Sequence, residues 1–263
     1  MRVFYLLLTT LFFINTSLAQ DGDLSALLSD INGDGEVRLL FFGDSITFGV
    51  GDGTSVGEFI EEPPITDGGD GYPRRVEELM GILADNEGAP GEFLTEGGID
   101  RFPAVVASSV ADVVGFFEGS NDAVHKVSGG AFELAVQRAI NVAGALGKQI
   151  ILFTIPPPCC DKESLSLFTG DYTSHIKELA VVNSLPVVDI ERAWQTTCNN
   201  ISTCHLYNLP EGLHPNIEGY DVIAQVIVAT LLGIDIFSEE GAVELEEALE
   251  LPEGTVIVKP ELE

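Results

Sequence analysis

The chain has 263 residues, 45% of them hydrophobic, which is enough for one sizeable core. Its 42 acidic residues against 12 basic ones give a formal net charge of -30. A surface this negative repels phosphate groups, which excludes nucleic acids and anionic membranes as partners. Because such an excess also repels itself at low salt, we expect a saline habitat.

The first residues have the pattern of a secretory signal peptide. Arg2 supplies the positive charge, Val3–Ile14 the apolar stretch, and Ser17-Leu18-Ala19 the cleavage site. The apolar stretch is too short for a transmembrane helix. We therefore expect a signal peptide over residues 1–19, export to the periplasm or the outside, and no stable membrane insertion.

A short motif ahead of the first strand resembles a calcium loop. Residues 30–36 read DINGDGE and fit its start, D-x-[DN]-x-[DN]-G. The twelfth position would be Phe41, where a calcium loop needs an acidic ligand. The motif therefore predicts a turn rather than a metal site.

Apolar runs and helical spacing alternate along the rest of the chain. The runs predict buried parallel strands at Arg38–Phe42, Glu92–Thr95, Asp112–Glu118, Gln149–Ile155 and Leu185–Ile190. Residues at three- and four-residue steps predict helices at Arg74–Asn86, Ala131–Leu146, Tyr172–Asn183 and Ile217–Leu232. This alternation predicts an α/β fold, a three-layer α/β/α sandwich, with ligands at the carboxyl ends of the strands.

The chain beyond Phe237 is strongly acidic, with nine Glu and one Lys. We expect one domain over residues 20–237, followed by a solvated and partly helical extension over residues 238–263. Within the extension, Thr255–Val258 has the composition to add an edge strand or to dock on a partner.

Export makes the four cysteines candidates for disulfides. We expect no bridge between adjacent Cys159 and Cys160, because it would strain the peptide between them. A Cys198–Cys204 bridge closing a short polar loop is the preferred pairing, with crossed pairs to Cys159 and Cys160 as the alternative. The sequence contains no Cys-x-x-Cys pair, so no structural zinc site is predicted.

Two serines compete for the role of nucleophile. Ser55 lies in GTSVG (residues 53–57), which fits the G-x-S-x-G pattern of a nucleophile elbow. An elbow, however, needs a strand leading into it, and Ser55 follows only a glycine-rich loop. Ser45 comes directly after the first predicted strand, so we predict Ser45.

A serine nucleophile needs a base that is itself held by an acid. His214 precedes the helix that begins near Ile217, and Glu211 stands three residues ahead of it. The remaining histidines lack such an arrangement. We expect His175 on the surface, and His125 in a structural position or lining the pocket.

The transition state also needs donors to an oxyanion. Asn121 lies in GSND (residues 119–122), after the third predicted strand, and so should emerge at the same sheet edge as Ser45. Gly97 and Gly98 follow the second predicted strand and allow a backbone N–H to approach closely.

Taken in order, GDSIT (residues 43–47), the glycine, GSND and Glu211-x-x-His214-Pro215 resemble the SGNH (GDSL-type) hydrolases over about residues 37–232. The resemblance implies a flavodoxin-like sheet and a serine esterase without metal or cofactor. It implies Ser45 as nucleophile, His214 as base, and an oxyanion hole of Ser45, Gly98 (or Gly97) and Asn121. The family usually has Asp where this chain has Glu211.

The substrate is expected to be a small-molecule or carbohydrate ester. Residues 71–74 and 95–100 resemble those of secreted carbohydrate esterases, and the acidic loop over residues 48–72 disfavours anionic substrates. That loop is either a substrate cover or a solvated surface. The alternatives are a lysophospholipase- or thioesterase-type member, or a non-catalytic carbohydrate-binding or adhesion protein on a degenerate hydrolase fold. The sequence does not determine the oligomeric state.

Overall fold

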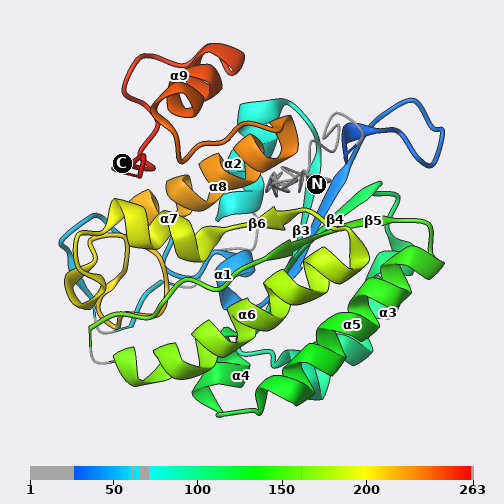
Figure 1. Cartoon of the computed structure of the whole chain (residues 1–263), viewed down its shortest axis with the longest axis horizontal. Coiled ribbons are helices and arrows are strands. Elements are labelled where there is room, and N and C mark those ends of the chain that lie inside the picture. Colours follow the sequence, from blue (N-terminus) through cyan, green and yellow to red (C-terminus); the bar gives the residue numbers. More distant parts are fainter. Residues whose placement is uncertain (1–26, 61, 65–70, 161, 262–263) are drawn as a thin grey trace, which may run out of the picture.

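A computed structural model of the chain describes residues 27–60, 62–64, 71–160 and 162–261 (Figure 1). Its centre is a five-stranded sheet in which every pair of neighbouring strands is parallel. In spatial order the strands are β3 (Ala84–Gly88), β1 (Leu39–Gly43), β4 (Val113–Phe117), β5 (Gln149–Phe153) and β6 (Val187–Val188). This is the predicted parallel, flavodoxin-like sheet.

Helices cover both faces of the sheet (Figure 1). One face carries α2 (Tyr72–Met80), α7 (Ile190–Thr197) and α8 (Ile217–Leu232); the other carries α3 (Ile99–Ser108), α5 (Gly129–Ala145) and α6 (Ser166–Asn183). Alternate residues of β1 serve the two cores, because Leu39 and Phe41 pack in one, and Leu40 and Phe42 in the other. The three-layer prediction is thus confirmed.

The remaining elements are short or peripheral. They are α1 (Ser45–Phe48), α4 (Ser120–Val124), α9 (Glu239–Ala248), the π-helix η2 (Leu94–Gly98), the 3-10 helices η3 (Glu163–Leu165) and η4 (Ile201–Thr203), and a two-stranded parallel ribbon of β2 (Phe59–Ile60) and β7 (Leu209–Pro210).

The second strand lies earlier in the chain than predicted. The strand is β3, at residues 84–88, whereas the predicted range 92–95 lies in a loop and in η2. The preceding helix was predicted to reach Asn86 but ends at Met80, because Gly81 adopts a left-handed φ of 64° and caps it. Strand β3 is at the sheet edge and only partly buried, so it has no apolar run to reveal it.

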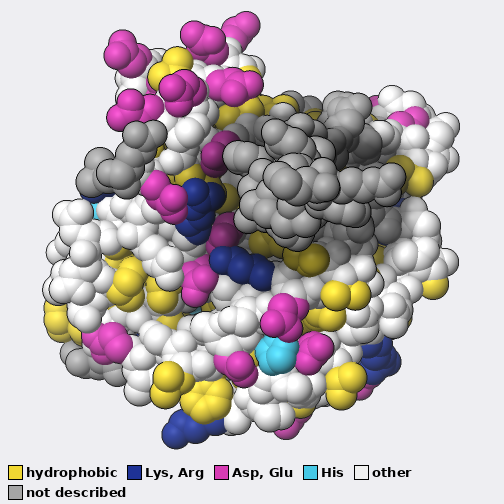
Figure 2. Space-filling model, viewed as in Figure 1, with side chains coloured by type: hydrophobic (Ala, Val, Ile, Leu, Met, Phe, Trp, Pro, Cys, Tyr) yellow, Lys and Arg dark blue, Asp and Glu magenta, His cyan; other side chains and the backbone are white. Residues whose placement is uncertain are grey.

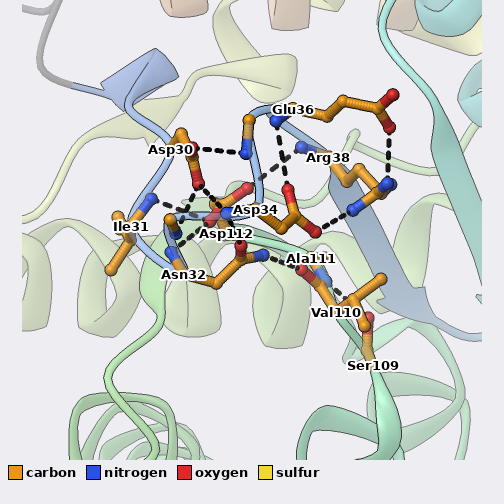
Figure 3. Close-up of polar contacts among 12 residues, drawn as sticks. Asp30, Ile31, Asn32, Asp34, Glu36, Arg38, Ser109, Val110, Ala111 and Asp112 are labelled. Atoms are coloured by element: carbon orange, nitrogen blue, oxygen red, sulfur yellow. Dashed lines mark hydrogen bonds and ion pairs between the residues drawn. The ribbon is translucent and has the colours of Figure 1, made fainter.

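The calcium-like motif folds as the predicted turn, closed by hydrogen bonds (Figure 3). The Asp30 carboxylate accepts the N–H groups of Gly33, Asp34 and Gly35. Beneath the turn, the Asp112 carboxylate accepts the N–H groups of Ile31 and Asn32. The Arg38 guanidinium offsets part of the negative charge of the turn by pairing with the carboxylates of Asp34 and Glu36.

The acidic C-terminal segment is more firmly packed than the sequence suggested. Leu245 of α9 and Val258 are buried in the core that contains α8. The Gln225 side chain donates to the Thr255 carbonyl and accepts the Ile257 N–H, so Thr255–Val258 docks on α8 without forming a strand. Acidic side chains gather on the outer surface over α9 (Figure 2). The domain boundary at residue 238 stays a prediction.

Both cysteine pairs form disulfides. The predicted Cys198–Cys204 bridge is confirmed. The expectation that Cys159 and Cys160 stay apart was wrong, because they are bonded to each other. The chain turns here: the Cys159 carbonyl accepts the Lys162 N–H at 3.0 Å, and Cys160 has a left-handed φ of 66°. This backbone lets the adjacent sulfur atoms meet.

The expected signal peptide lies outside the described residues. Within the ranges that are described, no helix is long and apolar enough to cross a membrane.

Candidate active site

The turn after β1 presents Ser45 at the carboxyl edge of the sheet. Asp44 caps α1, its Oδ1 accepting the Ile46 N–H at 2.9 Å, and Ser45 is the first residue of the helix. Only glycine fits at residue 43, because a Cβ there would lie 2.0 Å from Thr47 Oγ1 and 2.4 Å from the Phe117 carbonyl oxygen. The strand, turn and helix therefore fix the position of the Ser45 hydroxyl.

His214 lies in hydrogen-bond contact with this serine, although 169 residues separate the two, and Glu211 in turn contacts His214. His214 Nε2 is 2.8 Å from Ser45 Oγ, and His214 Nδ1 is 3.2 Å from Glu211 Oε1. When Nδ1 donates its proton to Glu211, Nε2 is left free to accept the serine proton. The structure thus brings the three predicted residues into one chain of hydrogen bonds.

Glu211 is held in its ionised form by the turn that carries it. Its Oε2 accepts the N–H groups of Leu213 at 2.9 Å and His214 at 2.8 Å. Burial alone would raise the pKa of Glu211, but the hydrogen bonds and charge of His214, with the Leu213 N–H, bring the pKa below its ordinary value. A carboxylate that stays charged can orient the imidazole and stabilise an imidazolium.

Asn208 joins the base to the glycine-rich loop after the nucleophile, a role that the sequence did not reveal. Its side-chain amide donates to the carbonyls of Gly51, His214 and Pro215, and Asn208 is fully buried. These bonds connect segments that are far apart in sequence, so no local pattern points to Asn208.

Two of the expected oxyanion donors are placed at the same edge. The Ser45 N–H has no hydrogen-bond partner among the described residues, and Asn121 lies in α4, directly after β4. The Asn121 amide donates to the Glu92 carbonyl at 2.9 Å, which leaves its second N–H for a ligand. Ser45 and Asn121 therefore both have an N–H to offer.

The expected glycine donor is not presented as predicted. The N–H groups of Gly97 and Gly98 both donate to the Phe93 carbonyl, at 3.1 and 2.9 Å, within η2. The loop that follows β3 itself contains Gly91, whose φ is +78° and whose N–H has no partner in the described part of the chain. The misplaced second strand is the reason that the sequence pointed to Gly98 and that Gly91 was not considered; which glycine serves as donor stays a prediction.

Asp122 shapes this side of the site and was also missed. The buried Asp122 carboxylate accepts the N–H groups of Leu94 and Thr95 and the Thr95 hydroxyl, at 2.8, 3.1 and 2.6 Å. It thereby caps the start of η2 and holds the loop of Gly91 and Glu92 beside Asn121. Its place next to Asn121 in GSND was the available signal, which reads equally well as an ordinary turn.

Two buried carboxyl groups lie beneath the nucleophile. Burial raises the pKa of Asp44 to about 6, although the Ile46 N–H and His214 oppose the shift. Burial also raises the pKa of Glu118 well above its ordinary value, and the charges of Asp44, Glu92 and Asp122 add to the effect. Neither Glu118 oxygen has a hydrogen-bond partner among the residues that the structure describes. The raised pKa favours the protonated, uncharged form of Glu118, which limits the negative charge near the site.

Ser55, His175 and His125 have partners outside the Ser45–His214–Glu211 chain of hydrogen bonds. Ser55 is exposed, and its N–H donates to the Glu58 carboxylate at 3.1 Å. His175 is part-exposed on α6, with Nδ1 3.3 Å from Glu133. His125 is exposed, and its ring centroid lies 4.2 Å from that of Phe93.

The loop over residues 48–72 is anchored at its base by an ion pair. Arg75 of α2 donates two hydrogen bonds to the Asp52 carboxylate, at 2.6 and 2.8 Å, and one to Asp221 of α8 at 2.5 Å. Asp52 also accepts the Gly71 N–H, so both ends of the loop meet at this carboxylate.

A parallel α/β/α sandwich with serine, histidine and carboxylate joined at its sheet edge defines a hydrolase class. The chain belongs to the GDSL-like lipase/acylhydrolase family, whose model matches residues 41–222, more than half of the sequence. Among curated proteins, none matches the sequence significantly.

Several solved structures have the same fold. The lipase/acylhydrolase from Enterococcus faecalis is 24% identical, with a TM-score of 0.59, over 75% of this chain and 96% of that one. The acetylxylan esterase Axe2 from Geobacillus stearothermophilus is 23% identical, with a TM-score of 0.61, over 77% and 96%. A lipolytic protein of the G-D-S-L family from Veillonella parvula is 19% identical, with a TM-score of 0.57, over 73% and 96%. At these identities the likeness shows the fold.

Proposed function

We propose that the protein is a secreted serine esterase that removes short acyl groups, above all O-acetyl groups of carbohydrates, by two-step acyl transfer. The observation that carries the proposal is the hydrogen-bonded chain from Ser45 through His214 to Glu211, at 2.8 and 3.2 Å. Such a chain raises the nucleophilicity of a serine hydroxyl at neutral pH.

In the first step, Ser45 Oγ attacks the ester carbonyl carbon while His214 Nε2 takes the hydroxyl proton. The carbonyl π electrons move to the oxygen, and the oxyanion is held by N–H donors of Ser45, Asn121 and Gly91. The bond to the alcohol then breaks, and the leaving alkoxide receives the proton from His214. Glu211 stabilises the imidazolium throughout.

In the second step, a water molecule attacks the acyl-serine as His214 removes its proton. The acyl–Oγ bond breaks, Ser45 regains its proton from His214, and the acid is released. The side chains of this chain account for every proton, with no cofactor in the scheme.

Charge supports a neutral substrate. The chain carries a formal net charge of -30, and Glu58 and Glu62 in the loop after the nucleophile are exposed. These charges repel anionic substrates, whereas acetylated sugars are uncharged. The structural likeness to an acetylxylan esterase points in the same direction. Export is supported by the signal-peptide pattern and by two disulfides.

A panel of esters tests the substrate. The protein from residue 20 onward is assayed with p-nitrophenyl acetate, butyrate and octanoate, with acetylated xylan, and with a lysophospholipid. The proposal expects the highest kcat/KM for acetate among the nitrophenyl esters, and release of acetate from the xylan. Preference for octanoate or the lysophospholipid would overturn it in favour of a lipase- or lysophospholipase-type enzyme.

A fluorophosphonate label separates an enzyme from a binding protein. An activated serine reacts with the label, and peptide mapping locates the adduct. We expect modification at Ser45. An unmodified protein that still binds acetylated xylan would favour the non-catalytic alternative.

A further inference from the structure

The adjacent-cysteine disulfide lies against the turn that carries the acid and the base. The Cys159 N–H donates to the carbonyl of Gly212, the residue that follows Glu211, at 2.9 Å. The loop of Cys159 and Cys160 follows β5, so it lies at the same carboxyl edge of the sheet as Ser45. A covalently closed turn is thus bonded directly to the Glu211–His214 turn.

The two turns are packed closely against each other. Gly212 has a left-handed φ of +73°, and a Cβ there would lie 2.5 Å from the Cys159 carbonyl oxygen and 3.1 Å from Cys160 Cβ. The two turns therefore pack backbone to backbone, and neither can move toward the other.

A second hydrogen bond joins the loop after β5 to the segment that carries the acid and the base. The Tyr207 hydroxyl donates to the Pro157 carbonyl at 2.7 Å, and Tyr207 pairs with Pro215 in an antiparallel bridge. Residues 157–160 thus contact the segment that carries Glu211 and His214 at two points, Tyr207 and Gly212.

From these contacts we propose that the Cys159–Cys160 disulfide positions the acid–base pair. The bridge fixes the turn that binds Gly212, and so keeps His214 Nε2 in line with Ser45. This inference rests on the proposed esterase function. It makes the disulfide a positioning element, since neither sulfur touches the reacting atoms.

The proposal implies that a reductant lowers the activity. Cys159 is fully buried, whereas Cys160 is partly exposed. A dithiol attacks the Cys160 sulfur as thiolate, the S–S bond breaks, and Cys159 leaves as a thiolate that takes up a proton. The second thiol of the reductant then displaces Cys160. Two electrons and two protons pass to the protein, and the reductant becomes a cyclic disulfide.

The second disulfide provides a matched control. Cys198 and Cys204 are also buried, and their bridge closes a short loop of its own. No hydrogen bond joins residues 198–204 to residues 211–214 within the described part of the chain. Reduction of that bridge should therefore leave the acid–base turn in place.

The test compares wild type, Cys159→Ala/Cys160→Ala and Cys198→Ala/Cys204→Ala with p-nitrophenyl acetate. Because small misplacements of a reacting group have large kinetic effects, we expect the first variant to lose roughly 10- to 100-fold in kcat. Its KM should stay within about twofold, since the substrate contacts are unchanged. The control variant should retain the wild-type kcat within about threefold, because no hydrogen bond among the described residues joins its loop to the turn that carries the acid and the base.

Reversible reduction keeps the test decisive where the first variant does not fold. Dithiothreitol should lower kcat of wild type and of Cys198→Ala/Cys204→Ala, and reoxidation should restore both. Unchanged kcat in reduced wild type, or in a folded Cys159→Ala/Cys160→Ala protein, overturns the inference. If oxidised wild type hydrolyses no ester, it is the proposed function that fails.

Discussion

The two oxygen atoms of the Glu211 carboxylate bind two different groups of His214, its ring and its backbone. Oε1 lies 3.2 Å from ring Nδ1, and Oε2 accepts the His214 backbone N–H at 2.8 Å. One side chain therefore fixes both the imidazole and the turn that carries it.

Removing the charge of Glu211 should impair chemistry more than binding. We expect Glu211→Gln to lower kcat by roughly 10²- to 10⁴-fold, because a neutral amide does not stabilise the imidazolium. Glu211→Asp keeps the charge and should fall between Gln and wild type. Steady-state kinetics with p-nitrophenyl acetate measure this. Wild-type kcat in Glu211→Gln would show that the acid has no part in catalysis.

We expect alanine substitutions at Asn121 and at Gly98 to have contrasting effects on kcat. Asn121→Ala should lower kcat by roughly 10²- to 10³-fold with little change in KM, because it removes a donor to the oxyanion. Gly98→Ala should retain nearly full activity, because alanine keeps the backbone N–H that donates to Phe93 and an added Cβ would meet nothing nearer than 3.4 Å. A large loss of kcat in Gly98→Ala would show that the site does not tolerate a side chain at residue 98.

Glu118 should make stability depend on pH in a defined direction. Its pKa is raised above the ordinary 4.5 in the folded protein. At a pH between the ordinary pKa and the raised pKa, the folded state therefore keeps a proton that the unfolded state loses. Wild type is therefore destabilised relative to Glu118→Gln as the pH rises above 4.5, by at most about 1.4 kcal/mol per pH unit.

Urea unfolding at pH 4 to 8 checks this prediction (the range brackets the ordinary carboxyl pKa). The free energies of unfolding of the two proteins should differ least at the acid end, and the variant should gain toward pH 8. A difference in the free energy of unfolding that is constant with pH, or that grows on acidification, contradicts the raised pKa of Glu118.

The Arg75–Asp52 pair should contribute far more to stability than an exposed pair on the same helix. The side chains of Arg75 and Asp52 are 18% and 7% exposed, against 57% and 61% for Arg74 and Glu78. We expect Arg75→Met to cost about 3–5 kcal/mol, since it leaves a buried carboxylate behind. Glu78→Gln should cost about 0.5 kcal/mol or less. Equal costs in urea unfolding would contradict this role.

The sequence identifies most of the site because each residue stands at a strand end or a helix start. An apolar strand precedes Ser45, and Glu211 lies three residues before His214, so their neighbourhood is encoded locally. The α8 range was predicted to the residue, because the Asn216 side chain caps its start and Gly233 ends it. These signals depend only on residues that are close in sequence, so they can be recognised without the structure.

The misses arise where long-range contacts decide. Strand β3 is polar and forms only because it pairs with β1 at the sheet edge. The segment that follows Gly91 is held by Asp122, which is distant in sequence and caps η2. The Cys159–Cys160 bridge likewise depends on a left-handed backbone at Cys160, which the residue type does not reveal.

The proposed esterase activity depends on Ser45, activated by His214, as the nucleophile. The most direct measurement is kcat/KM for p-nitrophenyl acetate in wild type, Ser45→Ala and Ser55→Ala. We predict that Ser45→Ala abolishes hydrolysis and that Ser55→Ala, exposed in its loop, leaves it unchanged. Loss of activity in Ser55→Ala, with Ser45→Ala still active, would contradict the account.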